Sequence, residues 1–98
     1  MLLSELRPGM ENIDLELELV DLNEPREVTT YTGIKHLLLE CTVKDSSRTM
    51  NLTVWNEKIE LLENLSPGDQ VELTNCFITS FKGVLSVNVG RDSDLRKK

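Results

Sequence analysis

Apolar and polar residues alternate along three segments in the first half of the chain. Residues 13–19 alternate leucine or isoleucine with acidic residues, a pattern typical of a strand with one buried face and one solvated face. The same period returns over residues 34–43 and 48–55, which a short polar turn joins. We expect the first strand to continue irregularly to about Thr29 and the three strands to form an antiparallel meander. In the second strand the expected buried set is Leu37, Leu39, Cys41 and Val43.

The period changes after this meander, where four apolar residues recur at helical spacing: Ile59, Leu61, Leu62 and Leu65. Asn56 is a candidate N-cap and Pro67-Gly68 closes the segment, so we expect one short helix of two to three turns. Residues 70–80 and 84–89 predict two further strands, with a turn over residues 81–83.

Three strands, one helix and two strands is the element order of the OB-fold. The predicted fold is therefore all-β: a five-stranded OB-fold Greek-key barrel with one short helix between strands 3 and 4. A single domain would cover residues 1–92. We expect the charged tail, residues 93–98, to fray.

The only tryptophan lies on the polar face of the third predicted strand. Successive side chains of a strand point to opposite faces, so Trp55 and Thr53 lie opposite the apolar set Met50, Leu52 and Val54. Leaving a large aromatic side chain in water forfeits roughly 1.5–3 kcal/mol of burial. Trp55 therefore indicates a binding surface rather than a core position.

The fourth predicted strand leaves two orientations open for its phenylalanines. If it runs straight, Phe77 and Phe81 share the buried face with Val71 and Leu73. A bulge near Asn75 would reverse the phase and turn both rings toward the side that carries Trp55. In that case Cys76 and Ile78 would continue the core face.

With the phenylalanines outward, Trp55, Phe77 and Phe81 would form a platform on which the bases of a single strand could stack, at roughly 1–3 kcal/mol per base. Thr53 belongs to the same surface. The candidate cations for phosphate contacts are Arg26, Lys35 and Lys82, and Arg48 and Arg91 are secondary candidates. Tyr31, in a predicted turn, is a candidate fourth ring, although a partly exposed turn tyrosine explains it as well.

The charge of the chain argues against binding a polyanion by bulk electrostatics. The net charge is -6 and the isoelectric point is near 4.7, whereas phosphate contacts draw their free energy from lysine and arginine. The acids are uneven, and eight of the seventeen lie between Glu5 and Glu27. Stacking on aromatic rings does not depend on net charge, so it answers this objection.

Signals for other chemistry are absent from the sequence. It has no glycine-rich phosphate loop, nucleophile elbow or paired cysteine motif, so we expect no enzymatic activity, metal, cofactor or small-molecule substrate. Cys41 and Cys76 fit buried free thiols better than a disulfide. No stretch approaches the roughly 18 apolar residues of a membrane span, so we expect no membrane partner and a cytoplasmic location, or a nuclear one in a eukaryote.

Five short motifs, in order along nearly the whole chain, carry a resemblance to a known family. They are Leu6-Arg7-Pro8-Gly9-Met10, Leu52-Thr53-Val54-Trp55, Pro67-Gly68-Asp69, Phe81-Lys82-Gly83, and Gly90-Arg91 with Asp94-Leu95. The chain resembles the single-OB-fold single-stranded DNA-binding proteins of archaea. It is also similar to the human proteins of the sensor-of-single-stranded-DNA complex and to the OB domains of replication protein A.

The resemblance implies that Trp55, Phe77 and Phe81 stack with bases, which favours the bulged fourth strand. It also implies phosphate contacts from Arg26, Lys35 and Lys82. The chain departs from this family at two places: Asn88 stands where some relatives carry an aromatic, and the segment over residues 34–45 is one residue longer than in archaeal relatives.

The sequence thus predicts a non-enzymatic protein that binds single-stranded DNA with little sequence preference, in replication, recombination or repair, with other proteins of these processes as further partners. One alternative is an OB module for protein contacts or oligomerisation in a replication protein A-like factor, which the acidic charge favours. The other is an RNA-binding OB domain, because stacking alone does not separate RNA from DNA. The chain could be a whole protein or one module of a longer one.

Overall fold

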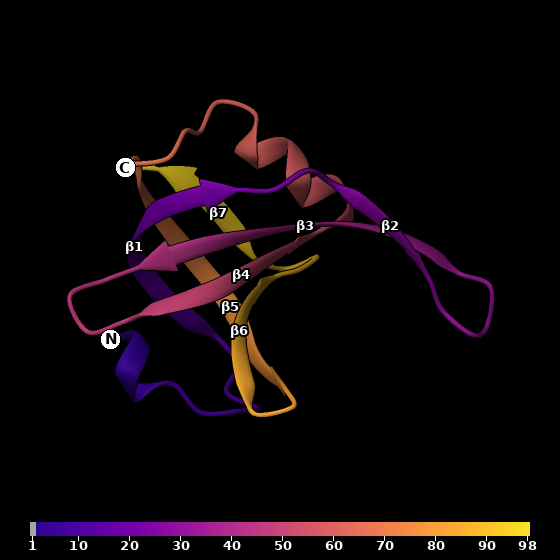
Figure 1. Ribbon diagram of the computed structural model, residues 1–98, viewed down its shortest axis with the longest axis horizontal. Helices are drawn as coiled ribbons and strands as arrows, with labels where there is room; N and C mark the ends of the chain where they lie inside the picture. Colours follow the sequence, from indigo (N-terminus) through magenta and orange to yellow (C-terminus); the bar gives the residue numbers. More distant parts are fainter. Residues whose placement is uncertain (1) are drawn as a thin grey trace.

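The computed structural model describes residues 2–98, which form a small barrel with a projecting hairpin (Figure 1). The chain begins with a single 3-10 turn, η1, and its second half contains a 3-10 helix, η2. The elements are η1 (Leu3–Glu5), β1 (Ile13–Leu22), β2 (Arg26–Thr29), β3 (Lys35–Lys44), β4 (Thr49–Trp55), η2 (Asn56–Leu62), β5 (Gln70–Phe81), β6 (Val84–Val89) and β7 (Asp94–Lys97).

Five of the strands close the barrel, in the order β1-β3-β4-β6-β5, because β5 also pairs with β1. The pair β4 and β6 is parallel, and the other pairs in the barrel are antiparallel. This closed order confirms the predicted OB-fold barrel. The helix lies between the third and fourth barrel strands as expected, and two additional short strands, β2 and β7, extend the sheet.

The barrel interior is aliphatic and follows the predicted alternation. Its core includes Ile13, Leu15, Leu17 and Leu19 of β1, Leu39, Cys41 and Val43 of β3, and Met50, Leu52 and Val54 of β4. Cys41 and Cys76 are free and buried, and burial raises the pKa of both thiols to about 12. The prediction was wrong for Leu37, which is 48% exposed on the projecting hairpin.

Strand β5 contains a bulge at Asn75, which decides between the two orientations that the alternation left open for the phenylalanines. Ile13 pairs with Cys76 and Leu15 with Leu73, so β5 has one more residue than β1 between these two pairs. Asn75 takes up the extra residue with φ of 54°, a conformation that asparagine adopts more readily than most residues. Asp14 Oδ1 accepts a hydrogen bond from the Asn75 backbone N–H at 2.9 Å. The bulge sends Cys76 into the core and Phe77 to the outer face.

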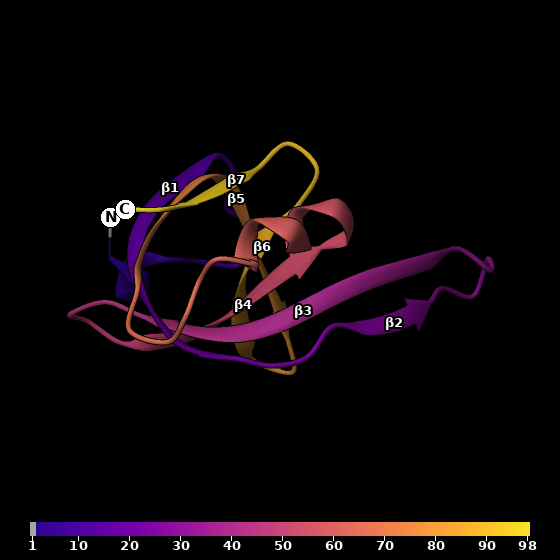
Figure 2. The ribbon, with the colours of Figure 1, turned by 90° about the horizontal axis from the view of Figure 1, so that it is seen from above.

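The first predicted strand divides into two. β1 ends at Leu22, and β2 pairs with the start of β3 to form a hairpin that projects from the barrel, called the arm below (Figure 2). A turn at residues 31–33 closes the arm, and Tyr31 at its tip is fully exposed. The arm lies along the longest dimension of the molecule, 40 Å.

Helix η2 covers one end of the barrel, where Leu62 and Leu65 are buried. It is a 3-10 helix of seven residues, and among residues 2–98 no helix has the length and apolar character needed to cross a membrane. Asn56 was predicted as its N-cap, but Trp55 occupies that position and makes no side-chain cap bond. Instead, the Asn56 side chain bonds to β3, as described below.

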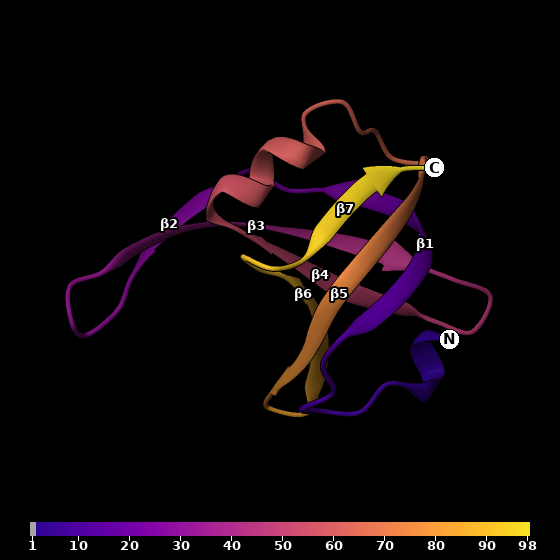
Figure 3. The same ribbon diagram turned by 180° about the vertical axis from the view of Figure 1, so that it is seen from behind.

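The last residues correct the predicted domain boundary. We expected residues 93–98 to fray, but Asp94–Lys97 form β7, which pairs with β5 on the far side of the barrel (Figure 3). Leu95 is 1% exposed and lies opposite Leu73. The domain therefore includes the tail, because one buried leucine anchors it.

Asp45 ties the N-terminal segment to the β3–β4 turn. Partial burial alone would raise its pKa, but hydrogen bonds from the Ser47 hydroxyl and from the backbone N–H groups of Leu3, Ser47 and Arg48 outweigh this effect and lower the pKa from 3.8 to about 2. The folded state therefore favours the carboxylate. Its stabilising contribution is complete above the unfolded pKa and is lost as the pH falls from about 4 to about 2.

We expect Asp45→Asn to lower the free energy of unfolding at neutral pH by about 1.5 kcal/mol, the usual contribution of a hydrogen bond to a charged group. The difference between wild type and variant should shrink as the pH falls toward 2. Urea unfolding of both proteins at several pH values measures this difference, and a difference that stays constant would contradict the assignment.

Candidate nucleic-acid interface

The outer face of the barrel brings Trp55 and Phe77 to the same side. β3 and β4 pair Leu38 with Trp55 and Glu40 with Thr53, and residues paired in this way share a face of the sheet. Thr53 in turn lies opposite Asn88 of β6, and Asn88 lies opposite Phe77 of β5. Four strands therefore contribute to one surface, with β6 between the two rings.

Asn88 holds the indole of Trp55 in position. Its Oδ1 accepts a hydrogen bond from Trp55 Nε1 at 3.2 Å. Its Nδ2 donates to Thr79 Oγ1 at 2.9 Å and to the Ser86 carbonyl at 3.2 Å, which fixes the orientation of the amide. Asn88 is buried and acts as an anchor for the indole.

His36 supports the other side of the indole. The two rings are 6.0 Å apart between centroids and nearly perpendicular, at 87°. Asn56 Oδ1 accepts the Leu37 backbone N–H at 3.1 Å, which leaves Asn56 Nδ2 to donate to His36 Nδ1 at 3.2 Å. Because Nδ1 accepts this bond, the neutral imidazole carries its proton on Nε2. Trp55 is thus held on two sides, and it is half-buried rather than fully exposed.

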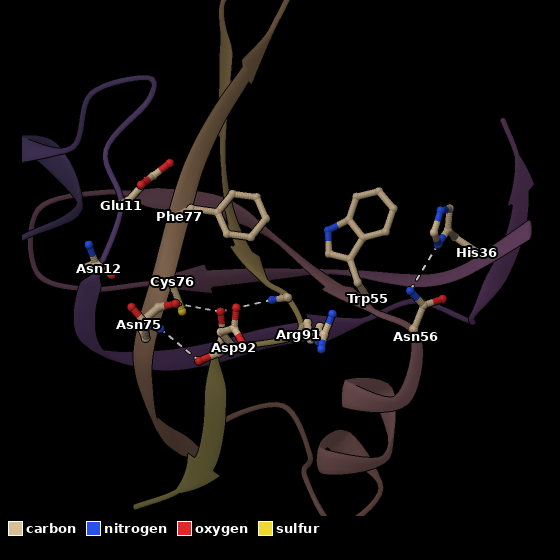
Figure 4. Close-up of a pocket in the computed structure, with 12 residues that line it drawn as sticks. Glu11, Asn12, His36, Trp55, Asn56, Asn75, Cys76, Phe77, Arg91 and Asp92 are labelled. Carbon is tan, nitrogen blue, oxygen red and sulfur yellow. Dashed lines mark hydrogen bonds between the residues drawn. The ribbon is translucent and has the colours of Figure 1, made fainter. Parts of the chain in front are cut away.

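Trp55 and Phe77 line one pocket of about 450 Å³ (Figure 4). His36 and Asn56 lie beyond the indole at one end, and Arg91 lies along the floor between the two aromatic side chains. A pocket with two aromatic walls and a guanidinium can receive a planar ring and an anionic group together.

Gly90 allows the Phe77 ring to lie against the backbone that follows β6. A Cβ at residue 90 would lie 2.9 Å from Phe77 Cε1, closer than side-chain carbons approach one another. Gly90 does not have a positive φ, so alanine fits its backbone conformation and would disturb only the ring.

We expect Gly90→Ala to displace the Phe77 ring and to destabilise the fold by roughly 1 kcal/mol through overpacking. The double variant Gly90→Ala/Phe77→Ala should be no less stable than Phe77→Ala alone, because the clash disappears with the ring. Thermal unfolding of the wild type and the three variants completes this cycle. Additive losses of stability would place the cause elsewhere.

Phe81 and Lys82 lie apart from this pocket, at the tip of the β5–β6 hairpin. Phe81 is on the same face as Phe77 and is 75% exposed, with Lys82 Nζ 5.4 Å from its ring centroid. Lys82 and Gly83 both have positive φ, which is typical of a two-residue hairpin turn that matches the twist of the strands. A ligand that contacts both Phe81 and the pocket must therefore run along β5 and β6.

The other predicted site residues differ in position. Arg26 lies opposite Leu38 on the Trp55 face, but its Nη2 is 2.6 Å from Glu40 Oε1 in an ion pair. Lys35 precedes His36 by one residue, so it lies on the opposite face of the arm, where Nζ is 3.8 Å from Glu27 Oε1. Thr53 is only 9% exposed, between its neighbours on β3 and β6, so little of it can touch a ligand.

Leu38 and His36 were not predicted as part of this face. Both lie on the outer face, and Leu38 is 5% exposed although it is not part of the barrel core. The β3–β4 turn could have indicated Leu38, because it pairs Lys44 with Thr49. Moving away from the turn by six residues along each strand leads from this pair to Leu38 and Trp55. Arg91 was ranked behind the other cations, but it is the one that lines the pocket.

Comparison with known proteins supplies the family. The model of the family described as "Single-stranded DNA binding protein Ssb-like, OB fold" matches residues 6–96. The chain belongs to this family. Among the curated proteins, the single-stranded DNA binding protein Ssb of Saccharolobus solfataricus is 27% identical over 85 residues, which is 87% of this chain and 55% of that protein. The chain therefore spans about half the length of this relative.

Solved structures of low sequence identity share the fold. The replication factor A related protein of Methanobacterium thermoautotrophicum has a TM-score of 0.84 at 22% identity, covering 100% of this chain and 89% of that chain. A replication protein A heterotrimer bound to single-stranded DNA contains a chain with a TM-score of 0.79 at 9% identity, covering 100% of this chain and 24% of that chain. These likenesses show the barrel, and the family match rests on sequence.

Proposed function

We propose that this chain binds single-stranded DNA with little sequence preference and acts in DNA replication, recombination or repair. The observation that carries the proposal is the pocket with Trp55 and Phe77 on the outer face of a barrel of the Ssb-like family. Bases stack on these two rings and on Phe81, and the strand follows β5 and β6 between the pocket and the hairpin tip. The role in DNA metabolism rests on the names of the relatives.

The distribution of ion pairs supports this proposal despite the net charge of -6. Four ion pairs on β1, β5 and the neighbouring turn neutralise acids away from the aromatic pocket: Lys44 with Glu18, Arg96 with Glu72, Lys97 with Asp69, and Lys98 with Glu16. Within residues 2–98, Lys82 and Arg91 form no ion pair. They flank the two ends of β6, where they can meet phosphates.

Titration with oligo-dT while following intrinsic fluorescence tests the proposal, because Trp55 is the sole indole. We expect strong quenching that weakens with salt. If Lys82, Arg91 and Arg26 contact three phosphates, a plot of log affinity against log salt has a slope of about -2. An unchanged signal, together with no retention of labelled single strands at low salt, would overturn the proposal. Stronger competition by oligo-rU than by oligo-dU would assign the platform to RNA.

A protein-contact module is the second candidate, and a specific surface favours it. Pro25, Leu37 and Ile59 line an apolar groove between the arm and η2, with Glu57 and Glu60 at its rim. This groove meets the aromatic pocket at Asn56, which lines both, but it carries acids that would repel phosphates. Failure of the oligo-dT titration would leave this groove as the main candidate for function.

A further inference from the structure

The polar end of the aromatic pocket presents hydrogen-bond acceptors that have no partner among residues 2–98. Glu11 and Asn12 lie on the side of the Phe77 ring away from Trp55, and Asn75 and Asp92 lie below them (Figure 4). The carboxylates of Glu11 and Asp92 form no ion pair and accept no hydrogen bond within residues 2–98. We call Glu11, Asn75 and Asp92 the acceptor edge of the pocket.

The fold holds this edge in place. Ile78 N–H donates to the Met10 carbonyl at 2.9 Å, and Gly9 N–H donates to the Ile78 carbonyl at 2.9 Å. These two bonds attach the N-terminal segment to β5 and so bring Glu11 beside Phe77. The bulge at Asn75 supplies the other half, because Asn75 Nδ2 donates to the Asp92 carbonyl at 3.0 Å. With Nδ2 occupied, Asn75 has its Oδ1 free to accept.

We propose that the acceptor edge selects a base with an exocyclic amino group, such as cytosine, at one position of an otherwise sequence-tolerant strand. A base stacked on Phe77 has its plane set by the ring and its edge toward Glu11, Asn75 and Asp92. Carboxylates accept from the N4 amino group of cytosine. Uracil and thymine present a carbonyl oxygen at the same place, which these acceptors repel.

The charges of the pocket agree with this assignment. Arg91 on the floor can donate to a ring nitrogen or carbonyl of the same base, or to a phosphate beside it. The carboxylates repel phosphates, so the backbone of the strand is directed away from the acceptor edge and toward Arg91 and Lys82. The acceptor edge thus contacts the edge of a base, whereas the aromatic rings contact its face.

This inference rests on the proposed function and is tested by comparing oligo-dC with oligo-dU, which differ in the hydrogen-bonding groups of the base and not in a methyl group. Oligomers of about 12 nucleotides fall within the site sizes of OB folds. In mildly alkaline buffer, where cytosine is unprotonated, we expect oligo-dC to bind about fivefold more tightly, the contribution of one net hydrogen bond. In Glu11→Gln/Asp92→Asn the ratio of the two affinities should fall to about one.

The matched control is Glu57→Gln/Glu60→Gln, which removes the same charge from η2, outside this pocket. It should leave the ratio unchanged even if both affinities rise. Equal binding of the two oligomers by the wild type would overturn the inference and leave the proposed function intact. A preference that survives in Glu11→Gln/Asp92→Asn would also overturn it. Binding of neither oligomer would instead refute the proposed function.

Discussion

Replacement of Trp55 by alanine is expected to weaken binding of single-stranded DNA by about 1–3 kcal/mol, or about 5- to 150-fold, the range measured when a stacking aromatic is removed. The indole is held by Asn88 and His36 before any ligand arrives. A ring that is already ordered loses little further conformational entropy on binding, so its stacking energy contributes almost in full. Anisotropy of a fluorescein-labelled oligo-dT reports the loss, since the variant has no tryptophan.

Two further variants separate stacking from other effects. Trp55→Phe keeps a ring but cannot donate to Asn88, so its affinity should lie between those of wild type and Trp55→Ala. Leu37→Ala is the matched control, because it truncates an exposed apolar residue on the opposite face of the arm and should leave affinity unchanged. A loss near zero for Trp55→Ala, with unchanged thermal stability, would place the platform elsewhere.

The barrel and the main aromatics could be predicted because they depend on local periodicity. Alternation over residues 13–19 and 48–55 gave the faces of β1 and β4, and hence the position of Trp55 outside the core. Alternation could not decide the phase of β5, because Phe77 is apolar on either face. The deciding feature is a backbone bulge, and the only local sign of it is Asn75, a residue type that tolerates positive φ.

The cations could not be ranked from the sequence, because their positions depend on pairing between distant segments. Arg26 meets Glu40 only through the register of β2 on β3, and Lys35 turns away because of parity within the arm. Arg91 reaches the pocket because the chain turns after β6. The predicted aromatics lie on one face, whereas Arg91, which lines their pocket, and Lys82, which lies over the Phe81 ring, come from the turns at the two ends of β6.

The tail was mispredicted for a related reason: four residues with one leucine give too little periodicity to indicate a strand. In the structure that leucine, Leu95, is buried against the core opposite Leu73. Leu95→Ala is therefore expected to lower the free energy of unfolding by about 2–5 kcal/mol, the usual range for a buried leucine. Urea unfolding measures this loss, and the midpoint should fall while the dependence on urea concentration stays the same.

Lys97→Ala provides the control, because it changes the same strand at an exposed position. Its ion pair with Asp69, at 3.7 Å, lies at the surface and should contribute less than about 1 kcal/mol. If the tail frayed, both variants would unfold at the urea concentration of the wild type. A large loss for Leu95→Ala alone would instead show that β7 stays paired with β5 and packed against the core. The aromatic pocket depends on the same region, because Ser93 Oγ donates to the Asn75 carbonyl at 2.7 Å and so links the start of β7 to the bulge that turns Phe77 outward.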